Sequence, residues 1–133
     1  MATEEIMLLS DHRAYPTIPA ANLGRAKAWY KDKLGLEPAQ ELPIGIVYRL
    51  ADGTGFQLYE SQFAGTAQNT AMGFTSNDVA ADMKMLRDRG VKFEEYDMPQ
   101  LKTDNGLATM GPYHGAWFKD SEGNILAIGD EPN

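Results

Sequence analysis

The chain repeats one pattern of residues. Residues 17–36 run from a short apolar stretch through a helical pattern to a stop at Gly35, and residues 71–91 follow the same order to a stop at Gly90. The two glycines lie 55 positions apart (90 − 35), and strand-like segments follow each of them. A repeat of this period predicts a supersecondary unit duplicated within the chain. We therefore expect an α+β fold of two tandem βαβββ modules, whose curved mixed sheets form a cleft.

The repeat also predicts how the 133 residues are organised. We expect a single domain, in which a first module (14–60) and a second module (70–129) are joined by a small, polar linker (61–69). Asn22 is a good N-cap for the first helix, and Asn77 or Asp78 for the second. These caps, with the two glycines, place one helix in each module.

Strand-like segments account for most of the remaining residues. We expect about eight strands, one of them at 91–96 and the last two in a closing hairpin. Residues 98–115 contain three glycines and two prolines, and we expect a long loop there with one short strand near 107–110. Residues 1–13 read as a polar arm. Each sheet then needs a helix on one face, and its other face is left bare.

Composition excludes several classes of function. The formal net charge is −7, from 12 Lys and Arg against 19 Asp and Glu, and the basic residues are scattered, so we expect no nucleic-acid partner. No apolar run is long enough to span a bilayer, so no membrane partner is expected. The chain has no cysteine, which excludes thiol chemistry and disulfides and fits a cytoplasmic location.

Three segments together resemble a known family. The first helix ends in KAWYKDKLGLEP, the second in MLRDRGVKF, and the chain closes with AWFKDSEGNILAIGD. Over residues 14–129 this resembles the vicinal oxygen chelate superfamily, which includes glyoxalase I, extradiol dioxygenases, fosfomycin-modifying enzymes and bleomycin-resistance proteins. The resemblance implies paired modules, a homodimer, and ligands held in sheet-lined clefts.

Metal-binding members of that family carry ligands in the first and last strand of each module. Counting back from the helix caps and along the last strands, the resemblance maps these positions to Tyr15, Gln57, Ala71 and Ala127. A divalent catalytic site needs about three ligands of the His, Asp or Glu type. Only Gln57 could coordinate here, so we expect no metal and no cofactor.

Side chains that alternate with core positions are the candidates for lining the cleft. Strand alternation puts Tyr15, Thr17, Gln57 and Tyr59 opposite the helix, and one of Tyr48 and Arg49 should join them. For all of these, ordinary solvent-facing positions are the alternative. The predicted ligand-binding residues are Tyr15, Thr17, Tyr48, Gln57, Tyr59, Met110, Tyr113 and Trp117. His114 is a weak catalytic candidate, because it is the one neutral-pH acid or base near the cleft and no partner is evident.

The resemblance and the missing ligands favour one function and leave two others open. The favoured one is a metal-free protein that binds a small organic molecule, of the bleomycin-resistance type, sequestering an aromatic or cationic antibiotic. The second is a lyase, isomerase or dioxygenase of glyoxalase type, metal-dependent or metal-independent. The third is a structural or regulatory protein with a vestigial cleft.

Overall fold

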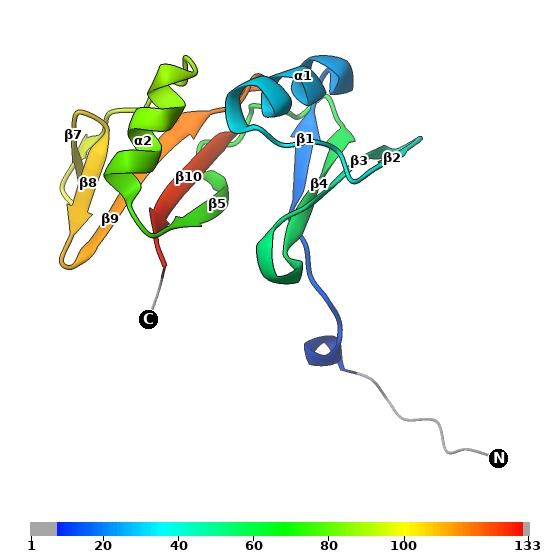
Figure 1. Cartoon of the computed structure of the whole chain (residues 1–133), viewed down its shortest axis with the longest axis horizontal. Helices are drawn as coiled ribbons and strands as arrows, with labels where there is room; N and C mark the ends of the chain where they lie inside the picture. Colours follow the sequence, from blue (N-terminus) through cyan, green and yellow to red (C-terminus); the bar gives the residue numbers. More distant parts are fainter. Residues whose placement is uncertain (1–7, 132–133) are drawn as a thin grey trace.

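The computed structural model describes residues 8–131, and two sheets with one long helix each make up its body (Figure 1). The first sheet has the strand order β1-β4-β3-β2, in which β1 is parallel to β4 and the other neighbours are antiparallel. Its elements are β1 (Thr17–Ala20), α1 (Leu23–Leu34), β2 (Gln40–Leu42), β3 (Gly45–Arg49) and β4 (Gly55–Glu60). Short 3-10 turns lie at Leu9–Asp11 and Ala51–Gly53.

The second sheet repeats this plan with a two-strand addition. Its order is β5-β10-β9-β8-β7-β6, again with the first strand parallel to the last. Its elements are β5 (Thr70–Ser76), α2 (Val79–Asp88), β6 (Asp97–Met98), β7 (Leu101–Asp104), β8 (Leu107–Met110), β9 (Tyr113–Lys119) and β10 (Ile125–Asp130). The predicted fold class, two tandem βαβββ modules with curved mixed sheets, is confirmed.

Both helices begin at a side-chain cap. Asn22 Oδ1 accepts a hydrogen bond from the Arg25 N–H (2.9 Å), and Asp78 Oδ1 accepts one from the Ala81 N–H (3.0 Å). The choice between Asn77 and Asp78 is thereby settled in favour of Asp78. Gly35 ends α1 with a φ of 69°, the left-handed conformation that glycine adopts without a steric penalty.

The expected long loop at 98–115 is wrong, although the one short strand expected near 107–110 is present as β8. Tight turns divide it into β7, β8 and the start of β9, so ten strands form in the described residues. Asn105 and Gly106 join β7 to β8 with φ values of 52° and 82°, and Asn-Gly is the preferred pair for a two-residue hairpin whose central residues both have positive φ. The strand expected at 91–96 is reduced to one isolated bridge between Phe93 and Phe118.

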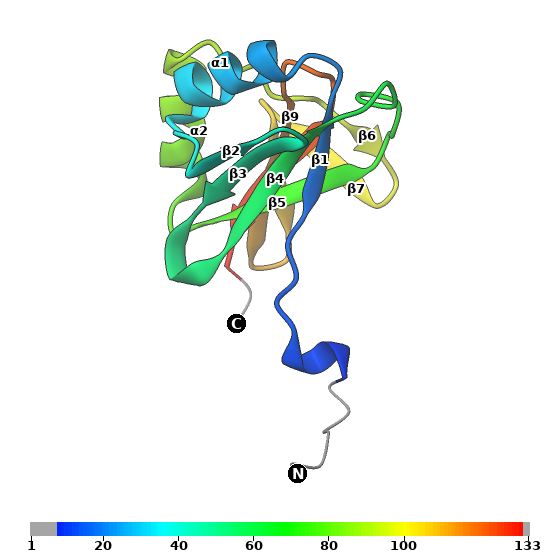
Figure 2. The same cartoon turned by 90° about the vertical axis from the view of Figure 1, so that its right-hand side faces the viewer.

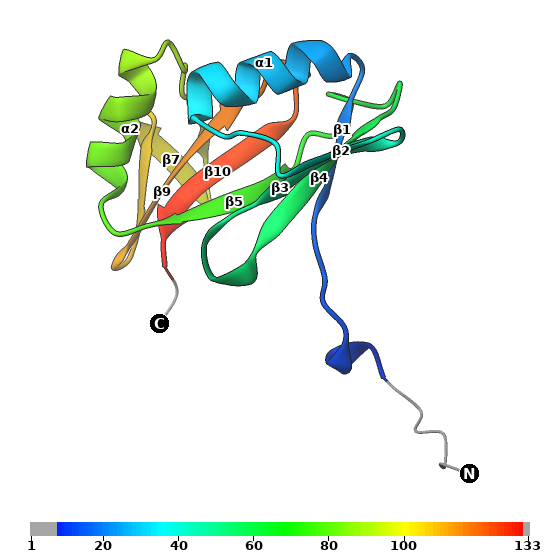
Figure 3. The ribbon, with the colours of Figure 1, turned by 45° about the vertical axis from the view of Figure 1, so that its right-hand side comes forward.

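The helix-bearing faces of the two sheets share one core. Ile18, Tyr30 and Leu58 of the first module belong to the same buried cluster as Phe118 and Leu126 of the second. In Figures 1 and 3, α1 lies above the seam where the two sheets approach each other, and Figure 2 shows the first sheet in front of the second. The faces without a helix therefore lie outside this core, one on each sheet.

A turn of the second module seals one end of the seam. The turn between β9 and β10 presents Asp120, whose buried carboxylate accepts hydrogen bonds from the Tyr30 hydroxyl (2.6 Å) and from the backbone N–H groups of Glu122 and Asn124 (both 2.9 Å). Burial, followed by the negative charge of Asp120, raises the pKa of Tyr30. The Asn124 amide donates to the Pro19 carbonyl at the free edge of β1 (2.7 Å).

The same turn also caps α1 from outside. Glu122, whose side chain is fully buried, accepts hydrogen bonds from the Asn22 N–H (2.9 Å) and the Arg25 Nε (2.8 Å). The Arg25 guanidinium is the largest cause of the lowered pKa of Glu122, about 2. We call this contact of residues 120–124 with α1 the closed junction.

Candidate functional site

Three of the predicted residues lie together on the bare face of the first sheet. Thr17 pairs with Gln57 across β1 and β4, and Tyr59 lies two residues farther along β4. Their neighbours Ile18 and Leu58 point into the core, where both are essentially unexposed. Contact of this face with a ligand stays a prediction.

The structure corrects the placement of Tyr48. Its side chain is 1% exposed and stacks on Phe56 with ring centroids 4.7 Å apart. The two residues pair across β3 and β4 on the helix-bearing face, so Arg49 is the one that points the other way. Burial, and then Glu41 and Glu37, raise the pKa of Tyr48 to about 12. Tyr15 precedes β1 and is 62% exposed.

An aromatic wall stands on the bare face of the second sheet. The rings of Trp117 and Tyr96 meet edge to face at 5.6 Å, and Trp117 Nε1 donates to Thr70 Oγ1 (3.1 Å). Met110 and Tyr113 pair across the β8–β9 turn, and each is about 40% exposed. Strand alternation places both on the same face as Trp117. We call Tyr96, Met110, Tyr113 and Trp117 the Trp117 wall.

Small residues form the floor beside this wall. Ala127 of β10 pairs with Gly73 of β5 on one side and with Trp117 of β9 on the other. A Cβ added at Gly115 would lie 3.5 Å from both Met110 Cε and a ring carbon of Trp117. The wall therefore borders a patch of nearly bare backbone, on which a flat ring can lie. Tyr96 is missing from the predicted set, because its contact depends on the unexpected β6–β7 hairpin.

The four positions implied for a metal do not fit one. Ala71 and Ala127 carry no donor atom, Gln57 offers only an amide, and Tyr15 offers only a phenol. Ala71 lies where the β5–β10 register shifts. Within residues 8–131 no group of three or more His, Cys, Asp or Glu could hold a metal ion. The donor chemistry of these residues therefore does not match the metal-binding pattern of the family.

His114 has a carboxylate partner but lies on the other face of β9. Its Nδ1 is 3.0 Å from Asp130 Oδ2, and its backbone N–H donates to the same oxygen (2.7 Å). The backbone and side-chain hydrogen bonds from His114 lower the pKa of Asp130. The pair borders a small hollow of about 410 Å³ at the N-terminus of α2. It is separated by the sheet from the Trp117 wall, since His114 and Trp117 alternate along the strand.

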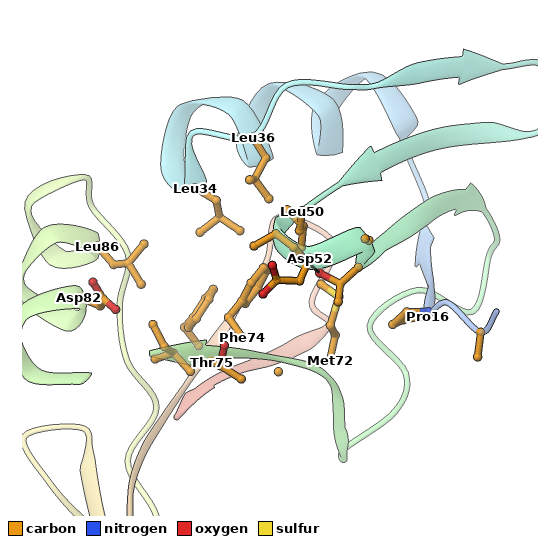
Figure 4. A pocket seen from close by; sticks show the side chains of 18 of the residues that line it. Pro16, Leu34, Leu36, Leu50, Asp52, Met72, Phe74, Thr75, Asp82 and Leu86 are labelled. Carbon is orange, nitrogen blue, oxygen red and sulfur yellow. Dashed lines mark hydrogen bonds between the residues drawn. The ribbon is translucent and has the colours of Figure 1, made fainter. Parts of the chain in front are cut away.

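A larger hollow opens between the modules on the helix-bearing side. It has a volume of about 800 Å³, and its walls come from the end of α1, the β3–β4 turn, β5 and α2 (Figure 4). We call this gap between residues 50–54 and α2 the open junction. None of the eight predicted residues lines it. Its apolar lining includes Leu34, Leu36, Leu50, Met72, Phe74 and Leu86.

A comparison with protein families identifies one that covers most of the chain. Residues 11–128 match the model of the Glyoxalase/Bleomycin resistance protein/Dioxygenase superfamily. No curated protein matches the chain. In the described residues, no helix is long and apolar enough to cross a membrane.

Solved structures share the fold at low sequence identity. UcmS2 is 20% identical, with a TM-score of 0.71 over 90% of this chain and 99% of that one. A glyoxalase/bleomycin resistance protein from Catenulispora acidiphila is 24% identical, with a TM-score of 0.63 over 90% and 97%. A lactoylglutathione lyase from Agrobacterium tumefaciens is 18% identical, with a TM-score of 0.64 over 90% and 93%. At these identities the likeness shows the fold alone.

Proposed function

Because the chain belongs to the glyoxalase/bleomycin resistance protein/dioxygenase superfamily, we propose that it binds a small aromatic molecule, such as an antibiotic, without a metal ion. The observation that carries the proposal is the bare face of the second sheet. On that face, Ala127 occupies a position at which metal-binding relatives carry a ligand, and Ala127 pairs with Trp117 across β10 and β9. An aromatic wall over a backbone floor favours stacking on a flat ring.

A homodimer completes this proposed site. The bare faces of the two sheets lie outside the shared core, on separate sheets. In such a dimer, the bare face of the first sheet of one copy would lie opposite the second sheet of its partner. The cleft between them would then be lined on one side by Thr17, Gln57 and Tyr59 and on the other by the Trp117 wall. We place this dimer in the cytoplasm, with neither nucleic acid nor membrane as a partner.

Ligand binding to the Trp117 wall has a direct test. A thermal-shift screen of aromatic antibiotics should give compounds that raise the melting temperature, because a ligand that binds only the folded state stabilises it. Trp117→Ala should weaken the binding of such a compound about tenfold. Phe63→Ala removes another exposed ring, in the segment between β4 and β5, and should leave binding unchanged.

Two results would contradict the proposal. One is a stoichiometric divalent metal that stays with the purified protein through dialysis. The other is a set of ligands whose affinities for the wild type and for Trp117→Ala are equal.

The alternative function is a lyase, isomerase or dioxygenase of glyoxalase type. The His114–Asp130 pair favours its metal-independent form, because a carboxylate at Nδ1 orients an imidazole for acid–base work. Turnover of a 2-oxo substrate that is lost in His114→Gln would support this alternative. Turnover that follows added metal would support the metal-dependent form.

A further inference from the structure

The closed and open junctions are built from equivalent parts of the two modules. The N-caps Asn22 and Asp78 are 56 positions apart (78 − 22). The β3–β4 turn, residues 50–54, lies between the paired residues Arg49 and Gly55. The β9–β10 turn, residues 120–124, lies between the paired residues Lys119 and Ile125, 70 positions farther along the chain. Each side chain of the closed junction therefore has a counterpart in the open one.

The open junction is hollow because its counterparts are smaller and apolar. Trp29 packs on Phe118 with ring centroids 6.4 Å apart, whereas its counterpart Met85 is 50% exposed. Tyr30 reaches Asp120 through its hydroxyl. The counterparts of that pair are Leu86 and Leu50, which cannot form a hydrogen bond. The contact that draws the turn onto the helix is thus missing, and a space of about 800 Å³ remains.

The hollow also contains a carboxylate that lacks the cationic partner found in the closed junction. Asp52 is the counterpart of Glu122, and the position of Arg25 is taken by Ala81. A second carboxylate, Asp82 of α2, lines the same space and accepts a hydrogen bond from Ser76 Oγ (2.5 Å). Figure 4 shows Asp52 and Asp82 on two sides of the hollow. Neither belongs to an ion pair within the described part of the chain.

Among the residues that line the hollow, one is cationic. Arg13 lies on the segment that leads into β1. Pro16, three residues farther on, is drawn at the end of Figure 4 opposite Asp82. In this view Asp52 lies between Asp82 and Pro16, so the space between the two carboxylates is the part of the hollow that attracts positive charge.

We infer that the open junction binds an organic cation, an amine or a guanidine on an apolar body. The cation takes the place between Asp52 and Asp82 that Arg25 takes beside Glu122, and the body fills the space between Phe74 and Leu86. The volume lies in the range of small-molecule sites. The hollow is on the helix-bearing side, so this inference does not rest on the Trp117 wall or on the function proposed for it.

Three probes with one carbon skeleton separate charge from apolar contact. Phenylbutylamine, phenylbutanol and phenylbutyrate share a phenyl ring on a four-carbon chain and carry a positive, a neutral and a negative head group. Titrations followed by NMR should show the amine binding about fivefold more tightly than the alcohol, and the carboxylate most weakly. The methyl signals of Met72, Met85 and Leu86 should shift.

Matched variants tie the charge effect to the two carboxylates. Asp52→Asn and Asp82→Asn should each weaken the amine about three- to fivefold and leave the alcohol unchanged. Asparagine tolerates the positive φ of Asp52 (56°), so that variant keeps the turn. Asp97→Asn, at an exposed carboxylate of β6, should bind the amine like the wild type.

Several results would overturn the inference. Equal affinity for the amine and the alcohol would show that charge plays no part in binding. Equal affinity of the amine for the wild type and for both Asp→Asn variants would show that these two carboxylates do not bind it. Absence of binding by all three probes also refutes it. If the signals of the same residues change with protein concentration in the absence of a probe, a second copy fills the hollow instead.

Discussion

The closed and open junctions set turns of equal length against α1 and α2, yet only the closed one is filled. Both turns carry a glycine with positive φ, Gly123 at 89° and Gly53 at 74°. The difference lies in the side chains, since Tyr30 and Asp120 form a buried hydrogen bond where the open junction offers two leucines. A duplicated backbone plan can thus be sealed at one end and hollow at the other.

Removing the carboxylate at the centre of the closed junction should have the largest effect. Asp120→Ala leaves the Tyr30 hydroxyl and two backbone N–H groups without their acceptor in a buried place. We expect the free energy of unfolding in urea to fall by about 4 kcal/mol. Asp52→Asn, which keeps the positive φ of the equivalent turn, should change it by less than about 0.5 kcal/mol. Similar losses from both substitutions would contradict the distinction between the junctions.

Acid should weaken the closed junction through Glu122. Folding lowers the pKa of this carboxyl from 4.5 to about 2, so its stabilising contribution is complete above the unfolded value and disappears as the pH falls through the folded one. Stability measured from neutral pH to about pH 2 should therefore lose about 2 kcal/mol that Glu122→Gln does not lose. In a double-mutant cycle, Arg25→Gln should remove most of this difference. If the stability of Glu122→Gln depends on pH as that of the wild type does, Glu122 is not the group responsible.

The two buried tyrosines provide a matched pair for the hydrogen bond. Tyr30 donates to Asp120, whereas the Tyr48 hydroxyl, although buried, has no partner among residues 8–131. Tyr30→Phe should therefore destabilise the protein by about 1–2 kcal/mol. Tyr48→Phe should be neutral or stabilising, because it removes an unpaired buried hydroxyl. Thermal unfolding of both variants gives the comparison, and the reverse order would contradict it.

The smallest effect should come from giving the open junction its missing cation. Ala81→Arg places a guanidinium at the counterpart of Arg25, and we expect it to pair with Asp52. We expect a gain of no more than about 0.5 kcal/mol in stability, because the pair is exposed. The gain should vanish in the presence of Asp52→Asn. A gain that persists in the double variant would contradict the pairing of the new guanidinium with Asp52, since alanine is already the better helix former.

The sequence predicts the fold because the repeat, the caps and strand alternation are local signals. Asn22 and Gly35 mark a helix without any knowledge of its neighbours. Tyr48 was misplaced because an isolated strand does not show which of its two faces meets the helix. The β7–β8 hairpin differs from the expected loop although Asn105-Gly106 is a strong turn signal, because the glycines and prolines around it are equally typical of a single long loop.

The hollow could not be predicted, because it depends on how the modules face each other. One signal was present in the repeat itself. Aligning the caps sets Trp29 and Tyr30 against the smaller side chains of Met85 and Leu86. The sequence alone does not show which turn packs on these positions, so the loss of side-chain volume does not by itself predict a hollow. The Trp117 wall was found in part, since Tyr96 joins it through the unexpected hairpin.

Filling the open junction with a larger side chain tests most directly whether small side chains keep it open. Met85→Trp restores the side chain that stands at the equivalent place in α1. We expect this variant to fold with an unchanged or higher melting temperature and to bind phenylbutylamine at least about tenfold more weakly than the wild type, because the ring occupies the hollow. A folded Met85→Trp protein that binds the amine with wild-type affinity would contradict the claim that small side chains keep this junction open.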